Sequence, residues 1–141
     1  MTHPAPPAIT HVALTVGDLT RSISWYTDVL GAAPAFVGEM LAGTPDHYEL
    51  AVWTTPNLGL HCFAERAAGE FDVRRPGLDH LAFECESRDD LLAWRDHLDA
   101  LGVEHGDVLD EPYGSGLAFR DPDGIALELF ASARRVKPPE R

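Results

Sequence analysis

Apolar and polar residues alternate through eight short stretches of the chain, and two longer stretches carry apolar residues at helical spacing. A period of two is typical of strands with one buried face, and a spacing of three or four residues is typical of amphipathic helices. The helical pattern predicts helices over residues 19–30 and 88–101, which end before Gly31 and at Gly102. The alternating pattern predicts strands near residues 9–16, 34–41, 47–54, 58–64, 78–85, 103–110, 116–120 and 125–131.

This order of elements occurs twice. Residues 9–14, Ile-Thr-His-Val-Ala-Leu, read like residues 78–83, Leu-Asp-His-Leu-Ala-Phe, with the two histidines 69 positions apart. Residues 58–63 likewise read like residues 125–130, which aligns a histidine with a glutamate 67 positions later. We therefore predict an α+β fold of two tandem βαβββ modules, whose strands form a curled mixed sheet around a concave pocket.

The predicted modules fit one domain, since 141 residues are enough to bury one core. The domain covers residues 9–131. Within it we expect module one at about 9–64, a linker at about 65–77 and module two at about 78–131. Residues 1–8 and 132–141 are rich in proline and charge and are expected to be tails.

Strand alternation assigns four potential metal ligands to the face away from the helices. Apolar residues such as Val12 and Leu14 should pack under the helix, which leaves the neighbouring histidine on the opposite face. The same argument applies to the strands near 58–64, 78–85 and 125–131. The four residues are His11, His61, His80 and Glu128.

A carboxylate within the apolar strand around Glu128 is costly unless it is paired or binds a metal. A lone strand histidine is more often structural, but two repeat-related pairs of ligand-type residues are better explained by a metal. Pseudo-twofold symmetry of the modules would bring them together. We therefore predict one divalent ion, Fe, Mn, Ni, Co or Zn, because mixed imidazole and carboxylate ligation suits these metals.

Other residues are expected to line the pocket. Phe63 and Phe130 suit apolar walls. Trp53 and Arg120 occupy repeat-related positions and could contact the substrate, although pairing of Arg120 with Asp121 or Asp123 in its own turn is the stronger interpretation. Glu84 follows His80 on the same face and is either a pocket residue or a solvated carboxylate. The remaining histidines are interpreted as non-ligands: His3, His47, His97 and His105.

Charge excludes some partners and composition suggests a compartment. The net charge of −12 and the pI of about 4.8 disfavour nucleic acid and anionic membranes. No apolar run is long enough to span a membrane, and Met1–Pro7 lacks the features of a signal peptide, so we expect a cytoplasmic protein. Cys62 and Cys85 lie in apolar strand patterns and are expected to be free thiols.

These motifs resemble the vicinal oxygen chelate superfamily, which includes glyoxalase I, methylmalonyl-CoA epimerase, fosfomycin-resistance transferases, bleomycin-resistance proteins and extradiol dioxygenases. The resemblance covers residues 9–131 and is strongest in residues 9–14, 78–83 and 119–129. It implies metal ligands at His11, His61, His80 and Glu128, a small-molecule substrate and a homodimer formed through sheet edges. It also implies Glu128 or His61 as the catalytic base.

The resemblance leaves three activities open. We predict a metal-dependent lyase, isomerase or epimerase that acts as a Lewis acid on an α-carbonyl or vicinal-oxygen substrate. A single-domain extradiol dioxygenase is one alternative. However, the tyrosine expected before the final glutamate is replaced by Ala118, and a fourth ligand at His61 would leave no position for O₂. A metal-free drug-binding protein of the bleomycin-resistance kind is the other.

Overall fold

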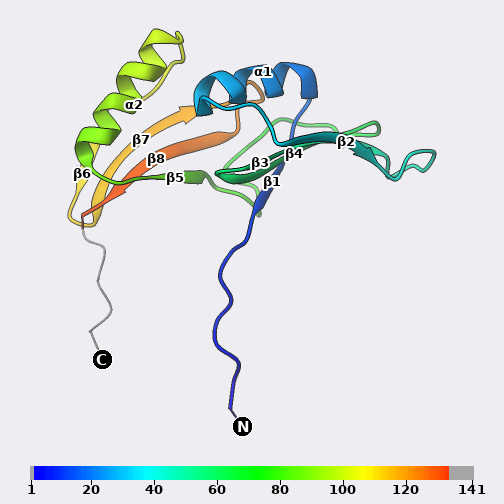
Figure 1. Ribbon diagram of the computed structural model, residues 1–141, viewed down its shortest axis with the longest axis horizontal. Coiled ribbons are helices and arrows are strands. Elements are labelled where there is room, and N and C mark those ends of the chain that lie inside the picture. Colours follow the sequence, from blue (N-terminus) through cyan, green and yellow to red (C-terminus); the bar gives the residue numbers. More distant parts are fainter. Residues whose placement is uncertain (1, 134–141) are drawn as a thin grey trace. The chain divides into compact units, whose positions relative to one another are not determined.

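The computed structural model describes residues 2–133, which form two βαβββ units (Figure 1). Within the described residues, the first compact unit contains residues 2–27 and 31–67, and the second contains residues 28–30 and 68–133. The elements of the first are β1 (Val12–Thr15), α1 (Leu19–Leu30), β2 (Phe36–Met40), β3 (Tyr48–Thr54) and β4 (Asn57–Phe63). Those of the second are β5 (Leu81–Cys85), α2 (Arg88–Ala100), β6 (Leu109–Glu111), β7 (Gly114–Arg120) and β8 (Ala126–Ser132).

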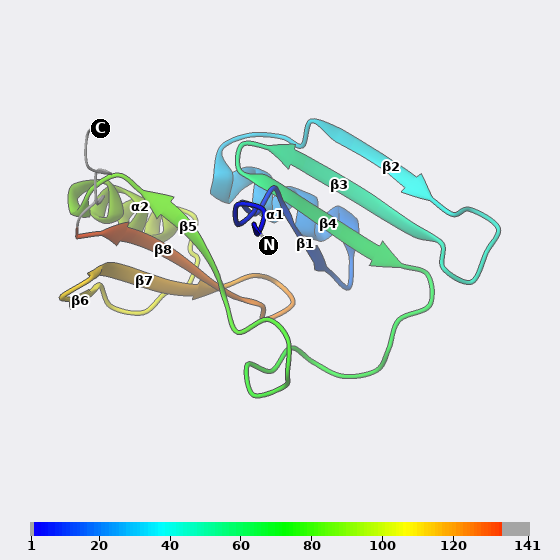
Figure 2. The same cartoon turned by 90° about the horizontal axis from the view of Figure 1, so that it is seen from below.

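Each unit has its own four-stranded mixed sheet. The strand orders are β1-β4-β3-β2 and β5-β8-β7-β6, as Figure 2 shows. In both sheets the first strand pairs in parallel with the last one, and the other neighbours are antiparallel. The prediction of two tandem βαβββ modules is confirmed, with two hydrogen-bonded sheets in place of one.

Local signals in the sequence set the ends of both helices. Asp18 caps α1 by accepting a hydrogen bond from the backbone N–H of Arg21, and Gly31 ends it with a left-handed backbone (φ 73°). Ser87 caps α2 through the N–H of Asp90. The bounds of α1 are those predicted, and α2 ends one residue earlier than predicted.

The core of the first unit lies between α1 and its sheet. Tyr26 of α1 and Trp53 of β3 are 0% and 2% exposed, and their ring centroids lie 6.1 Å apart. The indole N–H of Trp53 donates a hydrogen bond of 2.8 Å to the carbonyl of Ala32. Trp53 is therefore a core residue on the helix side of the sheet, and its predicted contact with a substrate stays a prediction that its burial does not favour.

The core of the second unit is made mostly of leucine. Leu91 and Leu98 of α2 are fully buried, as is Leu117 of β7, and Leu127 and Leu129 of β8 are nearly so. The strand residues in this set alternate with exposed or half-buried neighbours, so one face of the sheet is apolar and covered by α2. The opposite face is left for polar side chains.

The sixth strand is shorter than the prediction of residues 103–110. Its position is held by Asp110, which accepts hydrogen bonds of 2.8 and 3.0 Å from Arg88 and one of 2.5 Å from Ser115. Before it, His105 contacts Asp99 and the carbonyl of Gly106, and only an isolated bridge joins this segment to β7. Side-chain contacts at the end of α2 thus replace the expected strand pairing.

No helix within residues 2–133 has the length and the apolar character that crossing a membrane requires.

The buried position of Trp53 predicts the effect of Trp53→Phe. The variant leaves the Ala32 carbonyl without its indole donor and creates a small cavity, so the free energy of unfolding should fall by about 1–3 kcal/mol. Urea denaturation followed by circular dichroism measures this loss. Unchanged stability would contradict the core assignment.

The contacts of Asp110 predict a pH-dependent stabilisation. Hydrogen bonds from Arg88 and then from Ser115 lower the pKa of Asp110 from 3.8 to about 2. The ionised carboxylate therefore stabilises the fold above about pH 4, and this contribution is lost as the pH falls towards 2. Asp110→Asn should lower the melting temperature at pH 7, and the difference from wild type should narrow in acid. Asp107→Asn, which removes the same charge from the preceding segment, should show little change at either pH.

Candidate functional site

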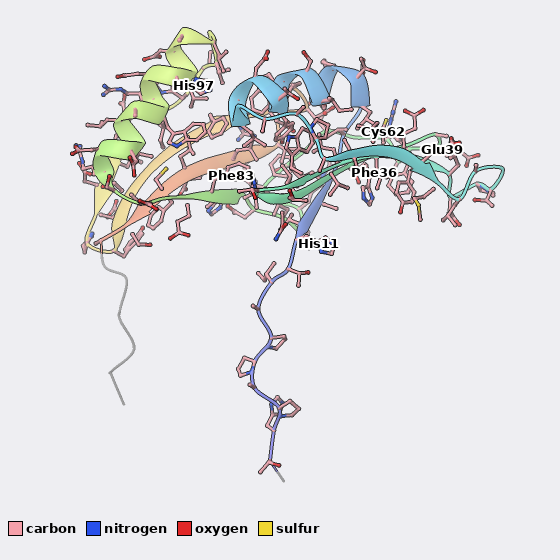
Figure 3. All side chains as sticks on the ribbon, viewed as in Figure 1. His11, Phe36, Glu39, Cys62, Phe83 and His97 are labelled. Atoms are coloured by element: carbon pink, nitrogen blue, oxygen red, sulfur yellow. The ribbon has the colours of Figure 1, made fainter. Side chains whose placement is uncertain are left out.

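In the first unit, His11 and His61 lie on the face of the sheet away from α1. His11 immediately precedes β1, and Figure 3 shows it on the side opposite α1. His61 lies in β4, where it pairs with Thr15 of β1. Because residues paired across a parallel ladder share a face, His61 is on the same side as Thr15, Ala13 and His11.

In the second unit, His80 and Glu128 lie together on the corresponding face. His80 immediately precedes β5, and Glu128 lies in β8 opposite Ala82. The Nε2 atom of His80 is 3.8 Å from Oε2 of Glu128. The two side chains are 46% and 26% exposed, so both are accessible to a ligand.

The second ring nitrogen of each strand-leading histidine has a partner that sequence reasoning missed. The Nδ1 atom of His80 lies 2.6 Å from Oδ1 of Asp79, and the Nδ1 atom of His11 lies 2.9 Å from Oγ1 of Thr10. Both partners immediately precede their histidines, so the repeated motif contained the signal. In each case the contact leaves Nε2 available.

The strand register corrects the alignment of His61 with Glu128. Val12 pairs with Leu58 in the first unit and Leu81 pairs with Leu127 in the second, so the separation is 46 residues in both. By this register, Glu128 corresponds to Gly59, two residues before His61. Strands rise about 3.3 Å per residue, which places His61 roughly 7 Å further along its strand than Glu128. The apolar residues around both positions had suggested the wrong alignment.

Glycine leaves room beneath the side chains on both faces. A Cβ atom on Gly59 would lie 3.8 Å from Nε2 of His61, so the imidazole extends back over this glycine. A Cβ atom on Gly116 would lie only 3.2 Å from Oε1 of Glu128. Gly116 thus lets the carboxylate lie close to β7, where a larger residue would displace it.

Aromatic rings surround His61. Tyr48 of β3 stacks on the imidazole with centroids 4.5 Å apart and an interplanar angle of 21°, and Phe63 lies 5.0 Å from Tyr48. Burial, and then the charge of His11, lowers the pKa of His61 from 6.5. The imidazole is therefore mainly neutral at pH 7 and can accept a proton or bind a metal. Tyr48 is a neighbour of His61 that the sequence pattern did not single out.

The other predicted residues have varied environments. Phe130 lies on the face that carries Glu128 and stacks on Tyr113 at 6.1 Å. Glu84 lies on the same face, because it pairs with Phe130 across the parallel ladder, and its side chain is exposed. Arg120 is exposed at the end of β7 and donates a hydrogen bond of 2.7 Å to the carbonyl of Gly124, a contact within the predicted turn but with a backbone group.

The donors form one pair in each unit. Within residues 2–133, no three side chains of His, Cys, Asp or Glu gather closely enough to hold a metal ion. A combined site of His11, His61, His80 and Glu128 therefore stays a prediction. Among the histidines interpreted as non-ligands, His47 has a partner elsewhere in the first unit: its Nε2 atom lies 3.0 Å from Oε2 of Glu39.

Comparison with known proteins places this geometry in a family. The family model of the glyoxalase/bleomycin resistance protein/dioxygenase superfamily matches residues 8–129. The chain is 29% identical over 126 residues to a biphenyl-2,3-diol 1,2-dioxygenase of Rhodococcus globerulus. That alignment covers 87% of this chain and 62% of the dioxygenase, so the chain spans less than two thirds of that relative's length.

Solved structures are similar to this chain in fold, and one of them carries the same family description. A glyoxalase/bleomycin resistance protein/dioxygenase domain from Frankia sp. EAN1pec is 34% identical, with a TM-score of 0.70, and the match covers 91% of this chain and 99% of that one. A variant of a fosfomycin resistance protein from Listeria monocytogenes, complexed with Mn(II) and 1S,2S-dihydroxypropylphosphonic acid, is 16% identical, with a TM-score of 0.62 and coverage of 94% and 96%. The chain belongs to the glyoxalase/bleomycin resistance protein/dioxygenase superfamily.

Proposed function

We propose that this chain is a metal-dependent enzyme in which His11, His80 and Glu128 hold one divalent ion for a substrate with two neighbouring oxygens. The observation that carries the proposal is the His80–Glu128 pair, an imidazole Nε2 and a carboxylate oxygen 3.8 Å apart on an accessible sheet face. Membership of a superfamily that contains enzymes supports it.

The donor set fits a first-row divalent metal. Ligand atoms at about 2.1 Å from one ion lie within about 4.2 Å of each other, and the His80–Glu128 separation meets this limit. Two imidazoles and one carboxylate suit Fe, Mn, Co, Ni or Zn. The Mn(II) bound by the fosfomycin resistance protein makes manganese a reasonable first choice for reconstitution.

His61 suits the role of acid or base beside the metal. The sequence favoured it as a fourth ligand, but its register places it two residues beyond the position that corresponds to Glu128. Its lowered pKa keeps the imidazole neutral at pH 7, ready to take a proton. Glu128, the other predicted base, then remains a ligand. When bound, the divalent ion supplies Lewis-acid stabilisation of negative charge that develops on a substrate oxygen.

The leading reaction class is isomerisation, epimerisation or elimination next to a carbonyl. Such reactions need one group to move a proton, and His61 supplies it. The residue that pairs with Glu128 on β7 is Ala118, so this position offers no phenol for dioxygenase chemistry.

A single-domain extradiol dioxygenase is the second candidate. The similarity to the biphenyl-2,3-diol 1,2-dioxygenase favours it, and so does the register of His61. Three protein ligands leave three positions of an octahedral shell, enough for two substrate oxygens and O₂. A role for His61 outside the ligand set therefore makes oxygen chemistry possible.

Metal stoichiometry tests the proposed enzyme directly. Protein purified without chelator or histidine tag should contain close to one first-row divalent ion per chain, measured by plasma emission spectroscopy. His80→Ala and Glu128→Ala should each lower the affinity at least tenfold with the circular dichroism spectrum retained, whereas His47→Ala, outside the site, should not. A wild-type protein that binds no metal would favour a drug-binding protein of the bleomycin-resistance kind.

Oxygen consumption separates the two reaction classes. With iron-loaded protein and 2,3-dihydroxybiphenyl or catechol, we expect no substrate-dependent oxygen uptake at an oxygen electrode. Sustained uptake that is lost in His80→Ala would instead establish the extradiol dioxygenase and reject the Lewis-acid reaction.

A further inference from the structure

The strand-leading histidines of both units are hydrogen-bonded through the same ring nitrogen. Asp79 contacts Nδ1 of His80 at 2.6 Å, and Thr10 contacts Nδ1 of His11 at 2.9 Å. In each unit the partner is the residue just before the histidine. The arrangement is therefore duplicated with the module, although a carboxylate stands in one copy and a hydroxyl in the other.

The two partners impose different constraints. An ionised carboxylate only accepts hydrogen bonds, so the Nδ1 atom facing Asp79 must carry the proton. In the neutral imidazole of His80, the lone pair is then on Nε2, the atom 3.8 Å from Glu128. A hydroxyl both donates and accepts, so Thr10 is compatible with either tautomer of His11.

The position of Asp79 separates this contact from the core. Its side chain is 75% exposed, and it lies outside β5, which begins at Leu81. Replacing it should therefore leave the fold intact, because exposed polar substitutions rarely change stability by much. An effect of the replacement on His80 can then be measured without unfolding the unit.

We propose that Asp79 is a positioning residue that holds His80 as the Nδ1–H tautomer and thereby presents Nε2 to the divalent ion. The inference rests on the metal site proposed above. Thr10 orients His11 in the same way but does not select its tautomer. The contact with Asp79 therefore fixes the tautomer of a predicted ligand in the second unit, whereas the contact with Thr10 does not fix one in the first. Hydrogen-bond partners of metal-ligating histidines contribute about 10–100-fold to affinity in metal sites generally.

The test combines metal titration with the tautomer of His80 in the metal-free protein. Competition titration with Zn²⁺ should give an affinity about 10–100-fold weaker in Asp79→Leu. Asp79→Asn, whose amide oxygen still accepts, should lose less. Thr10→Val should lose only a few-fold, and Glu86→Gln, an exposed charge control near the same strand, should match wild type. Imidazole ¹⁵N shifts at pH 8 should show the Nδ1–H form of His80 in wild type and a shift towards the Nε2–H form in Asp79→Leu.

The outcomes distinguish this role from the site itself. Asp79→Leu with wild-type Zn²⁺ affinity and an unchanged tautomer would overturn the role of Asp79 while leaving the metal site in place. A tautomer that depends on Asp79 in a wild-type protein that binds no Zn²⁺ would overturn the metal site, and the positioning role with it. Weaker Zn²⁺ binding together with the tautomer change, and with Glu86→Gln at wild-type affinity, would support the proposal.

Discussion

The parallel pairing of the first strand with the last strand is the constraint on which each unit depends. Leu14 pairs with Leu60, and Leu81 pairs with Leu127, so apolar side chains face the helix from both strands of each ladder. The strand pleat then leaves the histidines and the carboxylate on the other face. A slip of one residue would bury those polar groups and expose the leucines, so the energy of the core fixes the position of the site.

The same register holds different side chains in the two units. The level of Glu128 is taken by Gly59, and the level of His61 is taken by Phe130. The second unit therefore brings an imidazole and a carboxylate together. The first has a second imidazole further along the strand, stacked against Tyr48. The duplicated backbone thus carries an imidazole and a carboxylate in one unit and two imidazoles in the other.

The sequence predicted what depends on local periodicity and missed what depends on pairing. The helix at Leu19–Leu30 has a cap, a buried stripe and a terminal glycine in its own sequence, so its bounds were predictable. Register and side-chain hydrogen bonds join residues distant along the chain. For that reason, the sequence did not predict the alignment of His61, the burial of Trp53 or the late start of β6 at Leu109. Thr10 and Asp79 are a different case, because both stand next to their histidines in the repeated motif. Their role became visible only through their contacts with Nδ1 in the structure.

The two-residue displacement of His61 has a chemical consequence in the proposed site. A ligand must reach within about 2.1 Å of the ion, whereas a base must reach an atom of the substrate held by that ion. The backbone of His61 lies roughly 7 Å further along its strand, but its imidazole extends back over Gly59, to the level that Glu128 holds in the second unit. We assign His61 the second task because its lowered pKa keeps the ring ready to accept a proton. Gly59 accommodates this ring, because a Cβ atom there would only touch Nε2 at 3.8 Å, whereas a longer side chain would compete for the same space. The first unit thus has glycine at the level where the second has the carboxylate of Glu128, and the imidazole that would move the proton extends over that glycine.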